Sequence, residues 1–246
     1  MKRLALLLLI PLLLLGGYYI FYPMYQVYSL INYKQHSYDW NQKLTLRIDT
    51  PDGLLEASSI THMGVDYFPG GLPLAGTERS YYLTGEAVVA DLGEGRYLFA
   101  LLPKSELAER SFWDLYDTES RGAFLGRIQK QVGQPARPVP LKYYPLLVTF
   151  GDLSDPASVM RVDPADLAAV FGAGFALREI TLEVTDDPVT EGVVEGVLDY
   201  FTWPKEKRKE YRCSVGDCST FPMRIPNPNG TTAILTDNDF TARKLQ

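Results

Sequence analysis

The chain is poor in the side chains that most often carry catalysis or bind metals. Its 246 residues include only two His and two Cys. His-Glu-x-x-His, the helical zinc motif, is absent, and so is Gly-x-Ser-x-Gly, the nucleophile turn of many hydrolases. We therefore expect no metal and no cofactor, and the sequence assigns no catalytic residue.

Two sets of residues keep a chemical alternative open. His62 lies on an expected strand and could act as a general base, although a solvent-facing or core-edge His is the commoner fate of such a residue. The acidic segment 152–166 offers four carboxylates, but it lacks the Gly and Glu positions of an EF-hand loop. Two of its Asp residues precede Pro, and Asp-Pro is typical of helix starts.

Charge is missing from the N-terminal region. Residues 4–22 carry none, and the uncharged run continues through Tyr33. A helix of about 20 residues crosses the hydrocarbon of a bilayer. The alternative is a cleaved signal peptide, but the residues that follow the Leu run are too large for a small-x-small cleavage site. We predict a retained transmembrane anchor whose outer, interfacial end is marked by Tyr18, Tyr19, Tyr22 and Tyr25.

The predicted anchor also has features for packing and orientation. Pro11 would kink the helix, and Gly16 and Gly17 would let a neighbouring helix approach closely. Lys2 and Arg3 place the N-terminus in the cytoplasm by the positive-inside tendency. We therefore expect a single-pass protein of a bacterial inner membrane. Residues 1–33 would form the anchor and aromatic segment, and residues 34–246 a periplasmic domain with sub-blocks 34–132 and 141–246.

The exported part is acidic and holds both Cys. The whole chain has a formal charge of −6, so the part without Lys2 and Arg3 has −8, which argues against a nucleic-acid partner. Cys213 and Cys218 should form a disulfide in an oxidising compartment. A redox-active pair is the alternative, although the spacing is not Cys-x-x-Cys.

Hydrophobic periodicity predicts an α+β domain of antiparallel sheets with a few covering helices. Alternation predicts strands at 43–50 and 177–186 and a hairpin partner within 55–67. A second hairpin turns at 93–95, so that residues 40–102 would form one small sheet. Helices are expected after Lys104, at 119–132 and after the Asp-Pro pairs at 163 and 187, and the Pro-rich segment 133–145 should be a linker or a surface wrap.

The C-terminal forty residues end in a Pro- and Asn-rich tail that should be mainly irregular, with one late strand at 231–235. They also contain the basic run KEKRKEYR, for which a solvated, exposed loop is the commoner fate. Local positive charge on an acidic domain favours encounter with an acidic partner or lipid headgroups. The candidate contact residues are Lys205, Lys207, Arg208, Lys209 and Arg212.

Three stretches carry a resemblance: KLTLRIDTPDGLLEASSI, LTGEAVVADLGEGRYLFALL and the segment from YPLLVTF to TDDPVT. Together they resemble a group of membrane-anchored proteobacterial envelope proteins to which no function is assigned. The resemblance implies an envelope location and no activity. We expect a non-enzymatic protein that binds a partner in or at the membrane, as an accessory subunit of a complex. A membrane-tethered hydrolase and an immunity or inhibitor protein are the alternatives.

Overall fold

A computed structural model describes residues 18–19, 21–25, 27, 35–69, 78–103, 106–117, 120–215, 218, 223–227 and 230–242. The chain divides into two compact units. The first consists of Met1–Ser37 and Val65–Ser80, and the second of Tyr38–Gly64 and Tyr81–Gln246.

In the first unit, the described residues among 18–27 are helical, and the rings of Tyr18 and Tyr22 stack with centroids 5.2 Å apart. Ser37 Oγ donates a hydrogen bond to Asp66 Oδ1 at 2.7 Å. Pro11, Gly16, Gly17 and most of the predicted anchor lie outside the described residues. In the part of the chain that is described, no helix has the length and hydrophobicity needed to cross a membrane.

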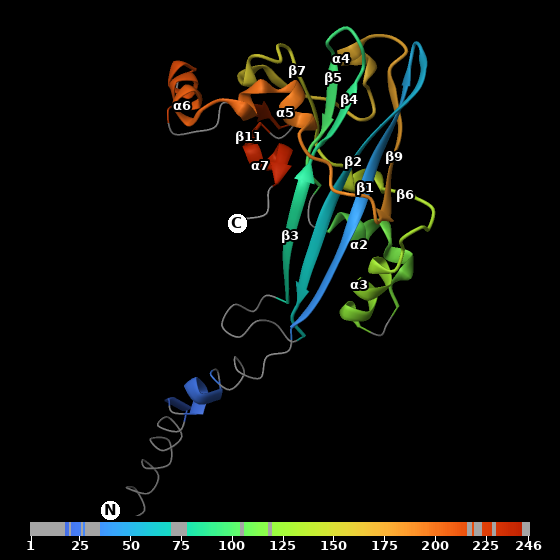
Figure 1. Cartoon of the computed structure of the whole chain (residues 1–246), viewed down its shortest axis with the longest axis vertical. Helices are drawn as coiled ribbons and strands as arrows, with labels where there is room; N and C mark the ends of the chain where they lie inside the picture. The colour runs from blue at the N-terminus through green and yellow to red at the C-terminus, as the bar shows by residue number, and fades with distance from the viewer. Residues whose placement is uncertain are drawn as a thin grey trace, which may run out of the picture. The chain divides into compact units, whose positions relative to one another are not determined.

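The larger sheet has six strands in the order β12-β3-β2-β1-β9-β6 (Figure 1). These are β1 (His36–Thr50), β2 (Gly53–Tyr67), β3 (Arg79–Glu86), β6 (Arg137–Pro138), β9 (Ala176–Thr185) and β12 (Thr241–Ala242). The expected strands at 43–50, within 55–67 and at 177–186 are confirmed, and β9 lies one residue earlier at each end than predicted. The alternation that predicted them is visible in the register, where Leu44 faces Leu182 and Leu46 faces Ile180, all four buried.

A second sheet of four strands has the order β4-β5-β7-β8, formed by β4 (Val88–Asp91), β5 (Tyr97–Ala100), β7 (Leu147–Phe150) and β8 (Val159–Arg161). The hairpin turning at 93–95 is confirmed, with Gly93, Glu94 and Gly95 all at positive φ. The prediction that 40–102 forms one sheet is wrong, because β5 pairs with β7 whereas β1 pairs with β9. Both sheets thus combine strands from either side of segment 133–145, which itself adds the edge strand β6.

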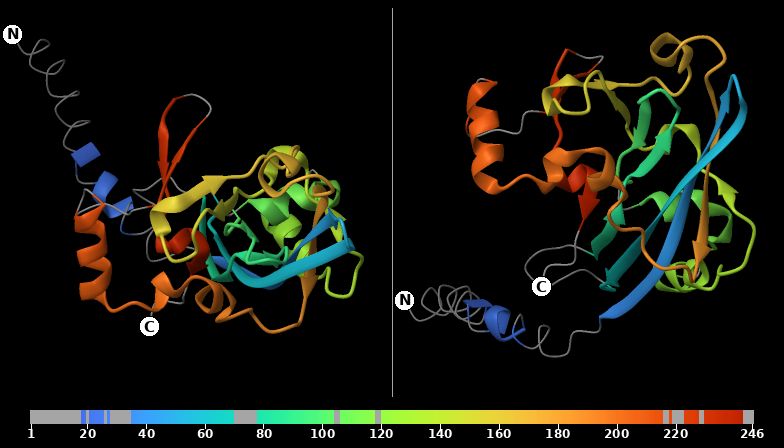
Figure 2. Two further views of the ribbon diagram at one scale, coloured as in Figure 1. Left: turned by 90° about the horizontal axis from the view of Figure 1, so that it is seen from above. Right: turned by 45° about the horizontal axis from the view of Figure 1, so that its top comes forward.

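The helices are short. They are α2 (Leu107–Ser111), α3 (Arg121–Gln129), α4 (Ala168–Phe171), α5 (Val193–Val197), α6 (Lys205–Ser214) and α7 (Asp237–Phe240), with 3-10 turns η1 (Trp113–Leu115), η2 (Leu141–Tyr143), η3 (Pro156–Ser158) and η4 (Asp199–Thr202). In Figures 1 and 2, α2 and α3 lie over one face of the long strands. Phe112, Phe124 and Leu125 are fully buried there.

A separate hydrophobic core lies under the C-terminal elements. It joins Phe99 and Val148 of the four-stranded sheet to Tyr200 and Phe240. Strands β10 (Arg224–Pro226) and β11 (Thr232–Ile234) pair with each other and contribute buried Ile225. The expected late strand near 231–235 is therefore confirmed.

Two helix starts predicted at Asp-Pro pairs are wrong. Asp163 Oδ1 accepts from the backbone N–H of Ala165, which closes an isolated turn, and α4 begins five residues later. After Asp187, the chain stays extended because Thr190 exchanges hydrogen bonds with the backbone of Ile60. Helix α5 begins only after Gly192, which has φ 81°.

Candidate functional site

The basic run forms a helix, α6, and this corrects the expectation of a solvated loop. It follows Pro204 and stands at the edge of the second unit in Figures 1 and 2. Lys, Arg and Glu are good helix formers, and Pro before the first turn is typical of a helix start. Its inner side carries Tyr211, whose ring meets Trp203 at 5.7 Å and Tyr200 at 6.2 Å between centroids.

Two of the cationic side chains of α6 contact other side chains of the second unit. Arg208 Nη1 forms an ion pair with Asp237 Oδ2 at 2.7 Å, and Lys207 Nζ lies 3.8 Å from the centre of the Trp203 ring. Arg212 is half-buried. Of the five candidate contact residues, Lys205 and Lys209 are the exposed cations for which no such internal contact is described. Of these five cations, only Arg208 thus has a described ion pair, and Lys205, Lys207 and Lys209 stay exposed.

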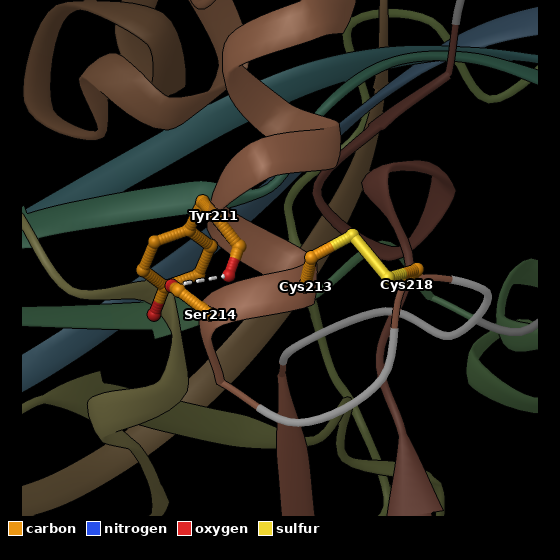
Figure 3. The surroundings of a disulfide bond; sticks show 4 residues. All are labelled: Tyr211, Cys213, Ser214 and Cys218. Carbon is orange, nitrogen blue, oxygen red and sulfur yellow. Dashed lines mark hydrogen bonds between the residues drawn. A yellow bond between two sulfur atoms is a disulfide. The ribbon is translucent and has the colours of Figure 1, made fainter.

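A disulfide joins Cys213 and Cys218 at the C-terminal end of α6, as predicted (Figure 3). Ser214 Oγ, in the same turn, donates to the Tyr211 carbonyl at 2.7 Å. The Tyr211 hydroxyl donates to the Asp155 carboxylate and accepts from the Ala157 N–H. Burial, followed by this bond to Asp155, raises the pKa of Tyr211 to about 12. The pair thus closes a loop beside a helix that is docked by an aromatic residue.

The carboxylates of segment 152–166 accept hydrogen bonds from donors two or three residues further along the chain. Asp152 Oδ1 accepts from the N–H and the hydroxyl of Ser154, and these bonds lower the pKa of Asp152. Asp155 caps η3, as its place before Pro predicts, and Asp166 accepts from the Ala169 N–H. Within the described ranges, no three His, Cys, Asp or Glu side chains gather as a metal-binding group.

His62 is half-buried on β2 and lines an open cavity of about 400 Å³. Its Nδ1 lies 2.9 Å from Asn41 Oδ1. Asn41 and His62 come from adjacent strands, so the sheet register brings them together. None of the described residues that line this cavity is a Ser or Cys, so among them a hydrolase centred on His62 would lack these nucleophiles.

The surface feature that the sequence did not reveal is a stack of aromatic and cationic side chains, the aromatic–arginine ladder, formed by Tyr116, Trp113, Arg110 and Tyr143. The rings of Trp113 and Tyr116 are nearly parallel, with centroids 4.8 Å apart and planes at 12°. Arg110 Cζ lies 5.8 Å from the Trp113 ring centre and 5.4 Å from that of Tyr143. Such cation–π contacts are worth about 0.5–1 kcal/mol at exposed sites.

Two rings of the ladder are exposed, and both pack against a buried aromatic ring. Trp113 is 48% exposed and Tyr116 40%, while buried Phe124 meets both rings edge-on at 6.1 and 5.4 Å. A hydrogen bond to Glu106 raises the pKa of Arg110 and fixes its guanidinium at 2.8 Å from that carboxylate. Of the two neighbouring aromatic residues, the structure buries Phe112 and exposes Trp113.

A cavity of about 530 Å³ adjoins the ladder, because Tyr143 belongs to both. Glu106 and Tyr143 line it, together with Lys142, Asp239 and the apolar side chains of Leu101 and Leu107. The ladder and this cavity combine aromatic rings, a fixed guanidinium and both signs of charge.

No protein-family model, curated protein or solved structure matches this chain. The resemblance to membrane-anchored envelope proteins therefore stays a prediction.

Proposed function

We propose that this is a single-pass envelope protein, held in a bacterial inner membrane by its N-terminal helix, whose periplasmic domain binds a protein partner through the aromatic–arginine ladder. The observation that carries the proposal is the exposure of Trp113 and Tyr116 in a rigid stack with Arg110. Trp, Tyr and Arg are the residues most enriched at energetic hot spots of protein interfaces. Exposed clusters of large aromatic side chains are typical of interaction surfaces.

The rigidity of the ladder supports the proposal. Its rings are already stacked and its guanidinium already paired, so little rotamer entropy would be lost on binding. The adjoining cavity could receive a side chain of the partner. The predicted anchor supports the location, because its uncharged run of residues 4–33 is long enough to span and ends in an aromatic cluster.

The test is recovery of a stoichiometric partner from native membranes. The tagged full chain is cross-linked in cells, extracted in mild detergent and quantified by mass spectrometry. We expect Trp113→Ala to lower partner recovery about tenfold or more, in line with a hot-spot loss of about 2 kcal/mol. Leu54→Ala is the matched control, because Leu54 is 43% exposed on β2 and is not part of the ladder.

A double variant, Lys205→Glu with Lys209→Glu, tests the outer face of α6 as the contact. A loss confined to this variant would move the interface to α6 and overturn the role of the ladder. Recovery of a partner-free monomer under several extraction conditions would overturn partner binding itself. A partner encoded beside this gene as a toxin would identify the immunity role.

A further inference from the structure

The hydrogen bonds of Asn41 determine which ring nitrogen of His62 carries the proton. Asn41 Nδ2 donates to the backbone carbonyl of Asp187 at 2.9 Å. A carbonyl only accepts, so Asn41 must turn its Oδ1 toward His62, where it lies 2.9 Å from Nδ1. The proton of neutral His62 is therefore on Nδ1, and Nε2 carries the lone pair.

Among the described residues that line the cavity, hydrogen-bond acceptors predominate and none is a Lys or Arg. Its lining residues are Asp39, Trp40, Asn41, His62, Gln129, Val132, Thr185 and Asp186. Asp39 and Asp186 are exposed, and neither has an ion pair with another described residue. Together with the Nε2 lone pair, their carboxylates form three acceptor groups around one space. Trp40 and Val132 add apolar surface between them.

The spacing of these groups favours a ligand larger than a metal ion. The described part of the chain holds no cluster of three His, Cys, Asp or Glu side chains close enough to share one ion. A cavity of about 400 Å³ falls within the range of small-ligand sites. An extended molecule with several N–H donors could meet the separate acceptors, and its alkyl part could contact Trp40 and Val132.

We propose that this cavity binds a small organic cation of the amine or guanidine class, with one N–H donating to His62 Nε2 and the positive charge near Asp39 and Asp186. This site is separate from the ladder, and it does not depend on the proposed partner. The role of Asn41 is positioning, because it keeps the acceptor nitrogen of His62 free for the ligand.

Titration calorimetry of the full chain in detergent, with spermidine and agmatine as probes, tests the site. We expect saturable binding of at least one probe, weakened fivefold or more by His62→Ala and by Asp186→Asn. Asn41→Ala should weaken binding as well, since Nδ1 then loses its fixed acceptor. Asp52→Asn, which removes the same charge at the β1–β2 turn, should leave binding unchanged.

Three results would overturn the site. The first is the absence of saturable binding for both probes, and the second is an equal loss in the Asp52→Asn control, which would show a general charge effect. The third is Ca²⁺ binding that is abolished by the same cavity variants, which would assign the carboxylates to a metal. His62→Gln keeps a polar side chain of similar reach and is the second variant in case His62→Ala does not fold. Thermal melting of each variant checks that it is folded.

Discussion

At the residue scale, two glycines with similar backbone angles sit in different surroundings. Gly53 has φ 121° at the β1–β2 turn, and nothing would lie within 4 Å of an added Cβ. Gly85 has φ 128° on β3, where an added Cβ would meet Thr61 Cγ2 at 2.9 Å and the Ile60 carbonyl at 3.0 Å. Both positions favour glycine by conformation, but only Gly85 is also confined by a neighbouring strand.

We predict that Gly85→Ala lowers the free energy of unfolding by about 2–4 kcal/mol, as the sum of backbone strain and steric overlap. Gly53→Ala should cost about 1 kcal/mol, because only the strain applies. Urea denaturation of both variants measures the difference. Equal losses would show that the contact with β2 contributes nothing.

The Tyr211 hydroxyl is a second residue whose effect can be isolated. Tyr211→Phe removes its bonds to Asp155 and Ala157, and we predict a loss of about 1–2 kcal/mol in unfolding free energy. Because the folded-state pKa of about 12 lies above the ordinary value of 10, the protonated hydroxyl stabilises the fold. This stabilisation is complete below pH 10 and is lost as the pH rises toward 12.

Urea denaturation of wild type and of Tyr211→Phe at several pH values between 8 and 12 measures how the unfolding free energy of each protein depends on pH. The difference in their unfolding free energies should shrink across the upper part of this range. A difference that stays constant with pH would mean that the hydroxyl has the same pKa in the folded and unfolded chain.

At the scale of elements, a buried carboxylate on a strand decides where a helix begins. Glu86 of β3 is 6% exposed, and its carboxylate accepts from the backbone N–H groups of Gly192, Val193 and Val194 at 2.6–3.0 Å. Helix N-termini leave such donors without intrahelical partners, and a negative charge there is stabilising. This contact joins α5 to the six-stranded sheet.

We predict that Glu86→Ala lowers the unfolding free energy by about 2–3 kcal/mol, since it leaves three donors without their acceptor. Glu86→Gln should cost less, because one oxygen acceptor remains. The exposed neighbour Glu191 supplies the control, and Glu191→Gln should change stability by less than about 0.5 kcal/mol. If Glu86→Ala unfolds at the same urea concentration as wild type, the carboxylate does not hold α5.

At the scale of the whole molecule, the main distinction is between an uncharged N-terminal region and an acidic remainder. Residues 4–33 carry no charge, whereas the chain as a whole has −6. Such a division is typical of an anchored domain, and it determines which compartment the disulfide and the ladder would face. The proposed location thus depends on whether the N-terminal region is retained.

We predict that the mature chain keeps residues 4–17 and sediments with membranes after alkaline washing. Mass spectrometry of the intact protein and of its N-terminal peptide measures this directly. A mature chain that begins near Tyr18 or later would show cleavage of a signal peptide and would overturn the anchor.

Local patterns in the sequence determined much of this fold. The strands β1, β2, β7 and β9 follow from alternating or continuous hydrophobic runs, and the hairpin turns follow from their Pro, Asp and Gly residues. The Cys213–Cys218 disulfide also agrees with the short spacing of the two Cys residues in the chain. Helix α6 could have been predicted from the sequence, because its Lys, Arg and Glu content and the preceding Pro204 both favour a helix. These features depend on residues close together in the chain.

Only the tertiary structure decided which strands share a sheet, where α5 begins, and which aromatic side chains remain exposed. Residues 40–102 separated into two sheets because β5 found its partner in β7, almost fifty residues away. Glu86 and Gly192 meet across 106 positions, and Asn41 and His62 across 21. The ladder joins Arg110 to Tyr143. Each of these pairings is set by long-range packing, which hydrophobic periodicity within a short window does not encode.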